Sequence, residues 1–145
     1  MLTVMVTVAF VTAVASANAQ SRTVVANIPF EFSVGEKALP SGQYTVKAIS
    51  EDANAIAVQN NRLSKAAIRL ANSIQMSQAS KQTKLVFHRY GPRYFLAEVW
   101  VSGERSGRQL LKSKEESTIE SQLAAIFPKG EQANYEIVEV VASLR

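Results

Sequence analysis

A single histidine, His88, is the residue of this 145-residue chain whose side chain is most often recruited for catalysis or metal binding. Histidine acts as a general base or a metal ligand when neighbouring groups orient it. His88 stands in an alternating apolar segment, and the expected hairpin register places it opposite Phe95. We therefore interpret His88 as a polar side chain within a sheet, and we predict no catalytic, metal-binding or cofactor-binding residue.

Carboxylates offer a second route to chemistry, because glycoside hydrolysis needs two of them on either side of a cleft. Glu31 and Glu98 fall in expected strands and could form such a pair, whereas Glu115, Glu116 and Glu120 fall in an expected helix. Solvated strand edges and helix faces are the usual place for such side chains. A small envelope hydrolase that uses carboxylates therefore stays as an alternative function.

Four residues beside an expected hairpin turn are the candidates for partner binding. They are Arg89, Tyr90, Arg93 and Tyr94, on either side of Gly91-Pro92. Arginine and tyrosine are enriched at the energetic centres of protein interfaces. We expect these side chains to be exposed at the tip of the hairpin and to contact a partner there.

The densest group of positive charges follows the hairpin and consists of Arg105, Arg108, Lys112 and Lys114. Such a group can contact an anionic surface, for example lipid headgroups or an acidic glycan, although a solubilising loop has the same composition. The net charge is +4, but the 16 lysines and arginines are spread along the chain. Because nucleic-acid binding normally requires clustered charge, a nucleic-acid partner is unexpected.

The first nineteen residues have the pattern of a secretion signal. An apolar run over residues 2–14 leads to Ala17 and Ala19, which form an A-x-A cleavage site before Gln20. The positive charge that usually precedes the apolar run is missing. The run is short for a membrane span, which needs about 20 apolar residues. We predict a signal peptide over residues 1–19, a periplasmic or extracellular location, and no transmembrane segment in the mature chain.

Residues 20–145 have the length of one domain, which must be held together without covalent cross-links. The chain contains no cysteine, and this excludes disulfides, thiolate metal sites, cysteine nucleophiles and an acylated cysteine anchor. A chain of this size buries roughly two-thirds of its unfolded surface, which is enough for a core. We therefore predict a single β-rich domain that is stabilised by packing.

Alternating apolar residues predict most of the elements that position these side chains. The expected strands span residues 28–34, 44–48, 55–59, 66–70, 85–90, 94–101 and 134–144. Residues 63–78 fit a helix nearly as well as a strand. In the hairpin over residues 85–101 a two-residue turn would pair Tyr90 with Arg93, His88 with Phe95 and Val86 with Ala97. Both faces of this hairpin are largely apolar, so we expect both to be covered.

One helix is expected after a flexible loop over residues 103–108. Ser113 and Glu116 have the spacing of a capping box, and Pro128 and Gly130 would end the helix. Ile119, Leu123 and Ile126 recur on one face of it. The predicted fold class is mainly β: an antiparallel β-sandwich or curved sheet with one helix packed on it in the C-terminal half.

Three segments together carry a family resemblance. The first is IPFEFSVG from residue 28 with LPSGQY from residue 39. The second is LVFHRYG from residue 85, and the third is YFL from residue 94 with VW from residue 99. In these patterns the chain resembles a set of uncharacterised small exported bacterial proteins. The resemblance implies export and a β-rich fold and brings no activity. The run L-P-x-G-x-Y-x-V also resembles the segment that leads into a strand in immunoglobulin-like sandwiches, where the tyrosine packs at a corner.

These observations favour an exported, non-enzymatic binding or structural module of the cell envelope. Its partner would be an envelope protein, a glycan or a lipid. The alternatives are the carboxylate hydrolase and a carrier that holds an apolar ligand between the sheet and the helix.

Overall fold

The computed structural model describes residues 22–49, 54–126 and 135–145, which form eleven strands and one helix. The predicted signal peptide and the predicted helix end at Pro128 and Gly130 lie outside the described residues. The elements are β1 (Val24–Ile28), β2 (Phe32–Val34), β3 (Lys37–Leu39), β4 (Gly42–Ala48), β5 (Ala55–Asn60), β6 (Lys65–Gln75), β7 (Lys84–Tyr90), β8 (Arg93–Trp100), β9 (Ser106–Leu110), α1 (Lys114–Ile126), β10 (Glu136–Val141) and β11 (Ser143–Leu144).

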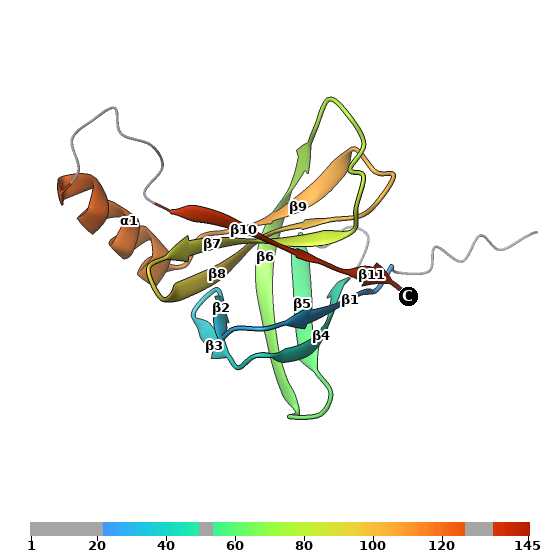
Figure 1. The fold of residues 1–145 in the computed structure, drawn as a ribbon, viewed down its shortest axis with the longest axis horizontal. Coiled ribbons are helices and arrows are strands. Elements are labelled where there is room, and N and C mark those ends of the chain that lie inside the picture. The colour runs from blue at the N-terminus through green and yellow to red at the C-terminus, as the bar shows by residue number, and fades with distance from the viewer. Residues whose placement is uncertain (1–21, 50–53, 127–134) are drawn as a thin grey trace, which may run out of the picture.

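The strands form one strongly curved sheet in the order β10-β7-β8-β9-β6-β5-β4-β1-β11, with β2 attached to β3 and β8 (Figure 1). The fold-class prediction of a mainly β chain with a curved sheet and one helix is confirmed. Neighbouring strands are antiparallel, except that β2 and β8 pair in parallel at Ser33 and Phe95. The sheet is therefore mixed rather than wholly antiparallel.

Strand β6 divides the sheet into two halves, because it pairs with β5 over Lys65–Leu70 and with β9 over Ala71–Gln75. The first half-sheet consists of β11, β1, β4, β5 and the start of β6. The second half-sheet consists of the end of β6 with β9, β8, β7 and β10. In Figure 1, β5 and β6 run at a steep angle to β7 and β8. A strand that turns a corner in this way is typical of orthogonal sheet packing.

The core lies between the two half-sheets and is rich in aromatic rings. Phe32 makes edge-on contacts with Tyr44, at 5.0 Å between ring centres, and with Phe87, at 5.5 Å. All three rings are fully buried. The Tyr44 hydroxyl donates a hydrogen bond of 2.6 Å to the Pro40 carbonyl, so the buried phenol keeps a partner. Tyr44 thus ties the turn before β4 to the core.

The single strand predicted over residues 28–34 is wrong, although its apolar side chains do reach the core. β1 ends at Ile28, and β2 begins at Phe32 after the bend at Phe30. Pro29 has no N–H to donate to a ladder, and the chain leaves β4 at this point to pair with β3 and β8. Alternation alone could not show that the chain changes neighbours within one apolar run.

The β7–β8 hairpin has the predicted register near its turn and a different one farther away. Tyr90 pairs with Arg93 and His88 with Phe95, as predicted, but Val86 pairs with Glu98 instead of Ala97. A β-bulge between Val86 and Phe87 accounts for the shift. Beyond the bulge, each β8 side chain lies on the face of the hairpin opposite to the one that the predicted register gives it. Leu96 and Val99 therefore both join the main core cluster, whereas Trp100 is buried outside that cluster.

The basic loop predicted over residues 103–108 is in part a strand, β9, which begins at Ser106. Gly107 allows it, because a Cβ atom at this position would lie only 2.7 Å from the buried Trp100 ring. The uncertain segment over residues 63–78 contains the strand β6.

Helix α1 begins as predicted and packs less fully than predicted. The Glu116 N–H donates a 3.0 Å hydrogen bond to Ser113 Oγ, which confirms the N-cap. Within the helix only Glu116 is buried. Ile119 and Leu123 are half-buried, and Ile126 is 71% exposed. The helix is therefore attached mainly through its first turn.

Candidate functional site

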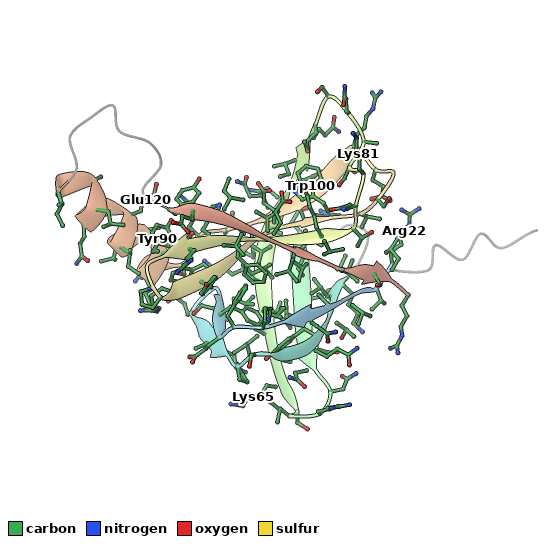
Figure 2. The ribbon with its side chains drawn as sticks, in the orientation of Figure 1. Arg22, Lys65, Lys81, Tyr90, Trp100 and Glu120 are labelled. Atoms are coloured by element: carbon green, nitrogen blue, oxygen red, sulfur yellow. The ribbon has the colours of Figure 1, made fainter. Side chains whose placement is uncertain are left out.

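A buried polar cluster joins the first turn of α1 to the end of the β7–β8 hairpin. Glu116 Oε1 lies 2.9 Å from His88 Nδ1 and accepts a hydrogen bond of 3.2 Å from the Tyr90 hydroxyl. The Tyr135 ring stacks on His88 with 4.0 Å between ring centres. Figure 2 shows Tyr90 at the hairpin end beside the helix. The cluster therefore joins three segments that are far apart in the sequence.

The electrostatics of this cluster favour a structural role. Burial, reinforced by the Glu116 carboxylate, raises the pKa of Tyr90 well above its ordinary value of 10.0, so the phenol stays protonated and donates. Two partners on Glu116 offset the cost of burying a carboxylate. A carboxylate that holds a histidine is part of a hydrolytic triad, but among the described residues no hydroxyl nucleophile bonds to His88. His88 lies in the sheet opposite Phe95, as expected.

The expected exposure of both tyrosines at the hairpin tip is wrong. Tyr90 is 4% exposed and faces the helix. Tyr94 is half-buried, and its ring stacks on Phe30 with 3.9 Å between ring centres. The sequence could not show this, because Glu116 lies 26 residues beyond Tyr90 and approaches it only in the folded chain.

The two arginines of the predicted tip also make contacts within the chain. Arg93 is exposed and forms an ion pair with Glu115. Arg89 donates a 2.8 Å hydrogen bond to the Gly91 carbonyl and lies over the Tyr94 ring. A partner-binding role for Arg89, Tyr90, Arg93 and Tyr94 stays a prediction, with Arg93 as the most accessible of them.

The basic group after the hairpin is divided between two elements. Arg105 and Arg108 lie at β9, whereas Lys112 and Lys114 lie at the start of α1. Lys112 bonds to the Glu120 carboxylate, and this bond raises the pKa of the lysine. The structure thus explains part of this basic group by contacts within the helix.

The carboxylates proposed for a hydrolase have separate surroundings. Glu98 accepts a 3.0 Å hydrogen bond from Trp100 Nε1, and Glu31 is exposed. Within the described part of the chain, no contact joins the Glu31 and Glu98 side chains. No observation therefore supports their use as a catalytic pair.

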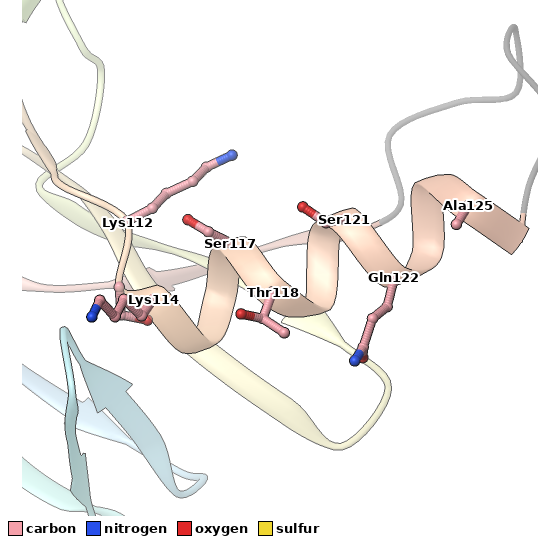
Figure 3. A pocket seen from close by; sticks show the side chains of 8 residues that line it. Lys112, Lys114, Ser117, Thr118, Ser121, Gln122 and Ala125 are labelled. Atoms are coloured by element: carbon pink, nitrogen blue, oxygen red, sulfur yellow. The ribbon is translucent and has the colours of Figure 1, made fainter.

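A wide open depression runs along α1 and bears on the predicted carriage of an apolar ligand (Figure 3). Its volume is about 640 Å³, and all of its lining residues come from the segment 112–125. Ser117, Thr118, Ser121 and Gln122 are among them, although carbon atoms make up most of the exposed lining. Because the depression is wide open and follows one side of a single segment, it does not enclose a ligand between the sheet and the helix.

The outer face of the first half-sheet differs from the rest of the surface in its side chains. On β6 the alanines Ala67 and Ala71 face the core, while Ile68 and Leu70 are 67% and 58% exposed. This is the reverse of the usual arrangement, in which the larger aliphatic side chain is buried. The period-two pattern of residues 66–76 did signal a strand here, but it did not reveal which side would be exposed.

Cross-strand pairing extends this aliphatic surface over neighbouring strands. Ile68 pairs with Ala57, which pairs with Lys47, and Leu70 pairs with Ala55. Ala55 and Leu70, which pair with each other, are each hydrogen-bonded to a further aliphatic residue. Ile49 N–H donates to the Ala55 carbonyl, and Leu111 N–H donates to the Leu70 carbonyl. We use the term aliphatic face for the exposed side chains of Ile49, Ile68, Leu70 and Leu111 together with the half-buried Ala55 and the buried Ala57 between them. Exposed apolar patches with polar rims typically mark interaction sites.

Lys47 is the cation that lies in the same cross-strand row as Ala57 and Ile68 of the aliphatic face. The strands β11, β1, β4, β5 and β6 contain no aspartate or glutamate. Their other cations, Lys65 and Arg69, have the strand parity of Ala67 and Ala71, and Arg69 donates to the Leu111 and Lys112 carbonyls. Arg62 precedes β6, and Arg145 follows β11. Glu51 and Asp52 lie outside the described residues. The five lysine or arginine ion pairs in the described part of the chain, and the His88–Glu116 contact, take their carboxylate from the helix, β10 or the β8–β9 turn.

Two further findings concern possible membrane spans and metal ligands, and the comparison with known proteins. Across residues 22–49, 54–126 and 135–145, no helix has the length and apolar composition of a membrane span, and no three acidic or histidine side chains gather as metal ligands would. The chain matches no known family model, no curated protein and no solved structure. The functional argument therefore depends on the surface described above.

Proposed function

We propose that this chain is an exported, non-enzymatic binding module that docks on the anionic surface of a lipid bilayer in the cell envelope. The contact surface is the aliphatic face together with the cations around it. The observation that supports this most directly is β6, which exposes Ile68 and Leu70 while it buries Ala67 and Ala71. Ile68 and Leu70 can be buried only when another surface covers the outer side of this strand.

Two physical terms would hold the protein on such a surface. Burial of a large aliphatic side chain contributes about 1.5–3 kcal/mol. Each lysine or arginine near an anionic membrane adds about 1 kcal/mol, and salt weakens this term within a Debye length. Lys47 stands in the same cross-strand row as Ile68, so the aliphatic and cationic groups can meet one interface together.

Charge complementarity favours a bilayer over the other possible occupants of this face. A second copy of the chain would bring Lys47 and its neighbours against like charges, which opposes face-to-face pairing. An acidic glycan would satisfy the cations but would leave Ile68 and Leu70 without an apolar partner. An anionic bilayer offers both phosphate charge and acyl chains.

Vesicle co-sedimentation tests this proposal. The protein is recovered from cells that export it, and its mass is measured so that any residual 1–19 segment is known. We expect binding to phosphatidylglycerol vesicles, weaker binding in high salt, and little binding to phosphatidylcholine vesicles. Replacing Ile68 and Leu70 by serine should reduce the affinity by roughly a hundredfold, because two buried aliphatic side chains are lost.

The matched control is the double variant Ile137→Ser and Val141→Ser on β10. These side chains are 65% and 64% exposed, but they lie on a strand that carries Glu136 and Glu139. The control should bind vesicles as the unmodified protein does. Equal losses in both double variants, or binding that does not depend on lipid charge, would refute the proposal. Sedimentation of the unmodified protein as a dimer that the Ile68 and Leu70 variant loses would point instead to a second copy on this face.

A further inference from the structure

We infer that a hollow beside the aliphatic face binds a phosphate group. The hollow has a volume of about 190 Å³, and Arg62 and Arg145 contribute to its lining. Read together with the proposed function, on which this identification of the ligand partly rests, the phosphate belongs to a lipid headgroup. A soluble phosphate ester carries the same chemistry and is distinguished by experiment.

The floor of the hollow is a cross-strand row on the outer face of the first half-sheet. Val25 of β1 pairs with Thr45 of β4, which pairs with Gln59 of β5, and all three line the hollow. On the same face, the next cross-strand row along the strands contains Lys47, Ala57 and Ile68. The hollow and the aliphatic face are therefore adjacent on one side of the same half-sheet.

Hydrogen bonds position the backbone beneath both arginines. The buried Asn60 side chain accepts bonds from the Arg62 and Leu63 N–H groups, at 3.1 and 3.3 Å, and this fixes the β5–β6 turn. At the opposite side, Arg145 N–H donates a 2.9 Å bond to the Thr23 carbonyl. The two guanidinium groups thus extend from backbone positions that are held by the sheet and its turn.

The lining has the side-chain donors that a phosphate needs, and two guanidinium charges outweigh the single α-carboxylate that Arg145 bears as the last residue of this chain. Two guanidinium groups can each offer a bidentate pair of N–H donors. The side-chain amides of Gln43, Gln59 and Asn61 add neutral donors, and no carboxylate side chain lines the hollow. Neither arginine forms an ion pair with a carboxylate in the described part of the chain.

The size of the hollow fits a headgroup rather than a whole ligand. Pockets that enclose drug-sized molecules have volumes of about 300–1,000 Å³. A hollow of about 190 Å³ holds a phosphate with part of its ester, while the rest of the molecule remains outside. This agrees with a ligand whose acyl chains would lie against the neighbouring aliphatic face.

Titration with glycerol 3-phosphate, followed by NMR of the side-chain amides, tests the site without any membrane. We expect saturable shifts of the Gln43, Gln59 and Asn61 amide signals, and much smaller shifts with acetate at equal ionic strength. Arg62→Gln and Arg145→Gln should each weaken the binding at least tenfold. Arg105→Gln, an exposed arginine at β9, is the matched control and should leave the binding unchanged. Equal shifts with acetate, or equal binding by all variants, would overturn the inference.

Vesicle binding by the same variants identifies the source of the phosphate. If the lipid headgroup occupies the hollow, glycerol 3-phosphate releases the protein from phosphatidylglycerol vesicles, and Arg62→Gln weakens vesicle binding severalfold. If Arg62→Gln loses affinity for glycerol 3-phosphate but binds vesicles as the unmodified protein does, the hollow binds a soluble phosphate ester instead of a lipid headgroup. Saturable phosphate binding without any vesicle binding would sink the proposed membrane function but keep the site. Vesicle binding without amide shifts on addition of glycerol 3-phosphate would refute the phosphate site but keep the proposed membrane function.

Discussion

The two half-sheets use their ionisable groups in opposite ways. In the second half-sheet and its helix, carboxylates accept bonds from His88, Tyr90, Lys84 and Arg93, so charge serves to join segments of the chain. In the first half-sheet Lys47 and Arg62 make no ion pair among the described residues, and large aliphatic side chains face outward beside them. The first arrangement stabilises the fold, whereas the second leaves Lys47 and Arg62 without an ion-pair partner in the part of the chain that the structure describes.

This difference separates residues that are expected to matter for stability from residues that the proposed function assigns to binding. A side chain whose polar atoms are already satisfied within the protein has little to offer a ligand. An exposed aliphatic row with unpaired cations gains when a complementary surface covers it. Substitutions in the second half-sheet should therefore change the free energy of unfolding, and substitutions on the first should change affinity.

The largest effect is expected from Glu116→Ala. The change leaves His88 Nδ1 and the Tyr90 hydroxyl without their shared acceptor inside the protein, at a cost of about 3 kcal/mol in the free energy of unfolding. Urea denaturation measures it. Glu115→Ala is the control, because Glu115 lies in the same helical turn but pairs with Arg93 at the surface, and it should cost less than about 1 kcal/mol. Similar losses in both variants would show that the buried cluster is not what holds the helix.

An intermediate effect is expected at alkaline pH. The raised pKa of Tyr90 means that the folded protein keeps a proton that the unfolded chain releases above pH 10.0. Folding stability is therefore fully present below that pH and falls above it, by about 1.4 kcal/mol per pH unit from this group alone. Unfolding midpoints measured from pH 9 upward should fall less steeply in Tyr90→Phe than in the unmodified protein. Parallel curves would contradict the assignment.

The smallest effect on stability is expected from Lys47→Ala. Lys47 is exposed and has no ion-pair partner among the described residues, so the free energy of unfolding should change by no more than about 0.5 kcal/mol. Its affinity for phosphatidylglycerol vesicles should nevertheless fall roughly fivefold, since one cation is lost from the contact. A variant that loses stability while it keeps its affinity would reverse the comparison between the two half-sheets.

The sequence predicted the elements whose signals are local. The hairpin register near Gly91 follows from a two-residue turn, and the start of α1 follows from Ser113 and Glu116. The bulge beside Val86 had no signal, because both faces of the hairpin are apolar and either alternation is consistent with the pattern. Strand β9 lies partly within the loop expected over residues 103–108, because the sequence does not show that Gly107 makes room for the Trp100 ring.

The candidate surface could not be predicted in the same way. Ile68 and Leu70 are ordinary strand residues by type, and only the packing of Ala67 and Ala71 inward shows that the larger side chains point out. The hairpin tip was misjudged for a related reason. Whether Tyr90 is exposed depends on a carboxylate from a distant helix, and such long-range contacts leave no trace in local spacing.

Strand β6 has a mechanical consequence for the whole domain. Because one continuous backbone supplies ladder partners to both β5 and β9, neither half-sheet can come apart without stripping hydrogen bonds from the other. Strands β10 and β11 repeat the device at the far edges, where a single residue, Ala142, separates a pairing with β7 from a pairing with β1. We expect a domain connected twice in this manner to unfold as one cooperative unit, so the aliphatic face should remain intact until the entire domain unfolds.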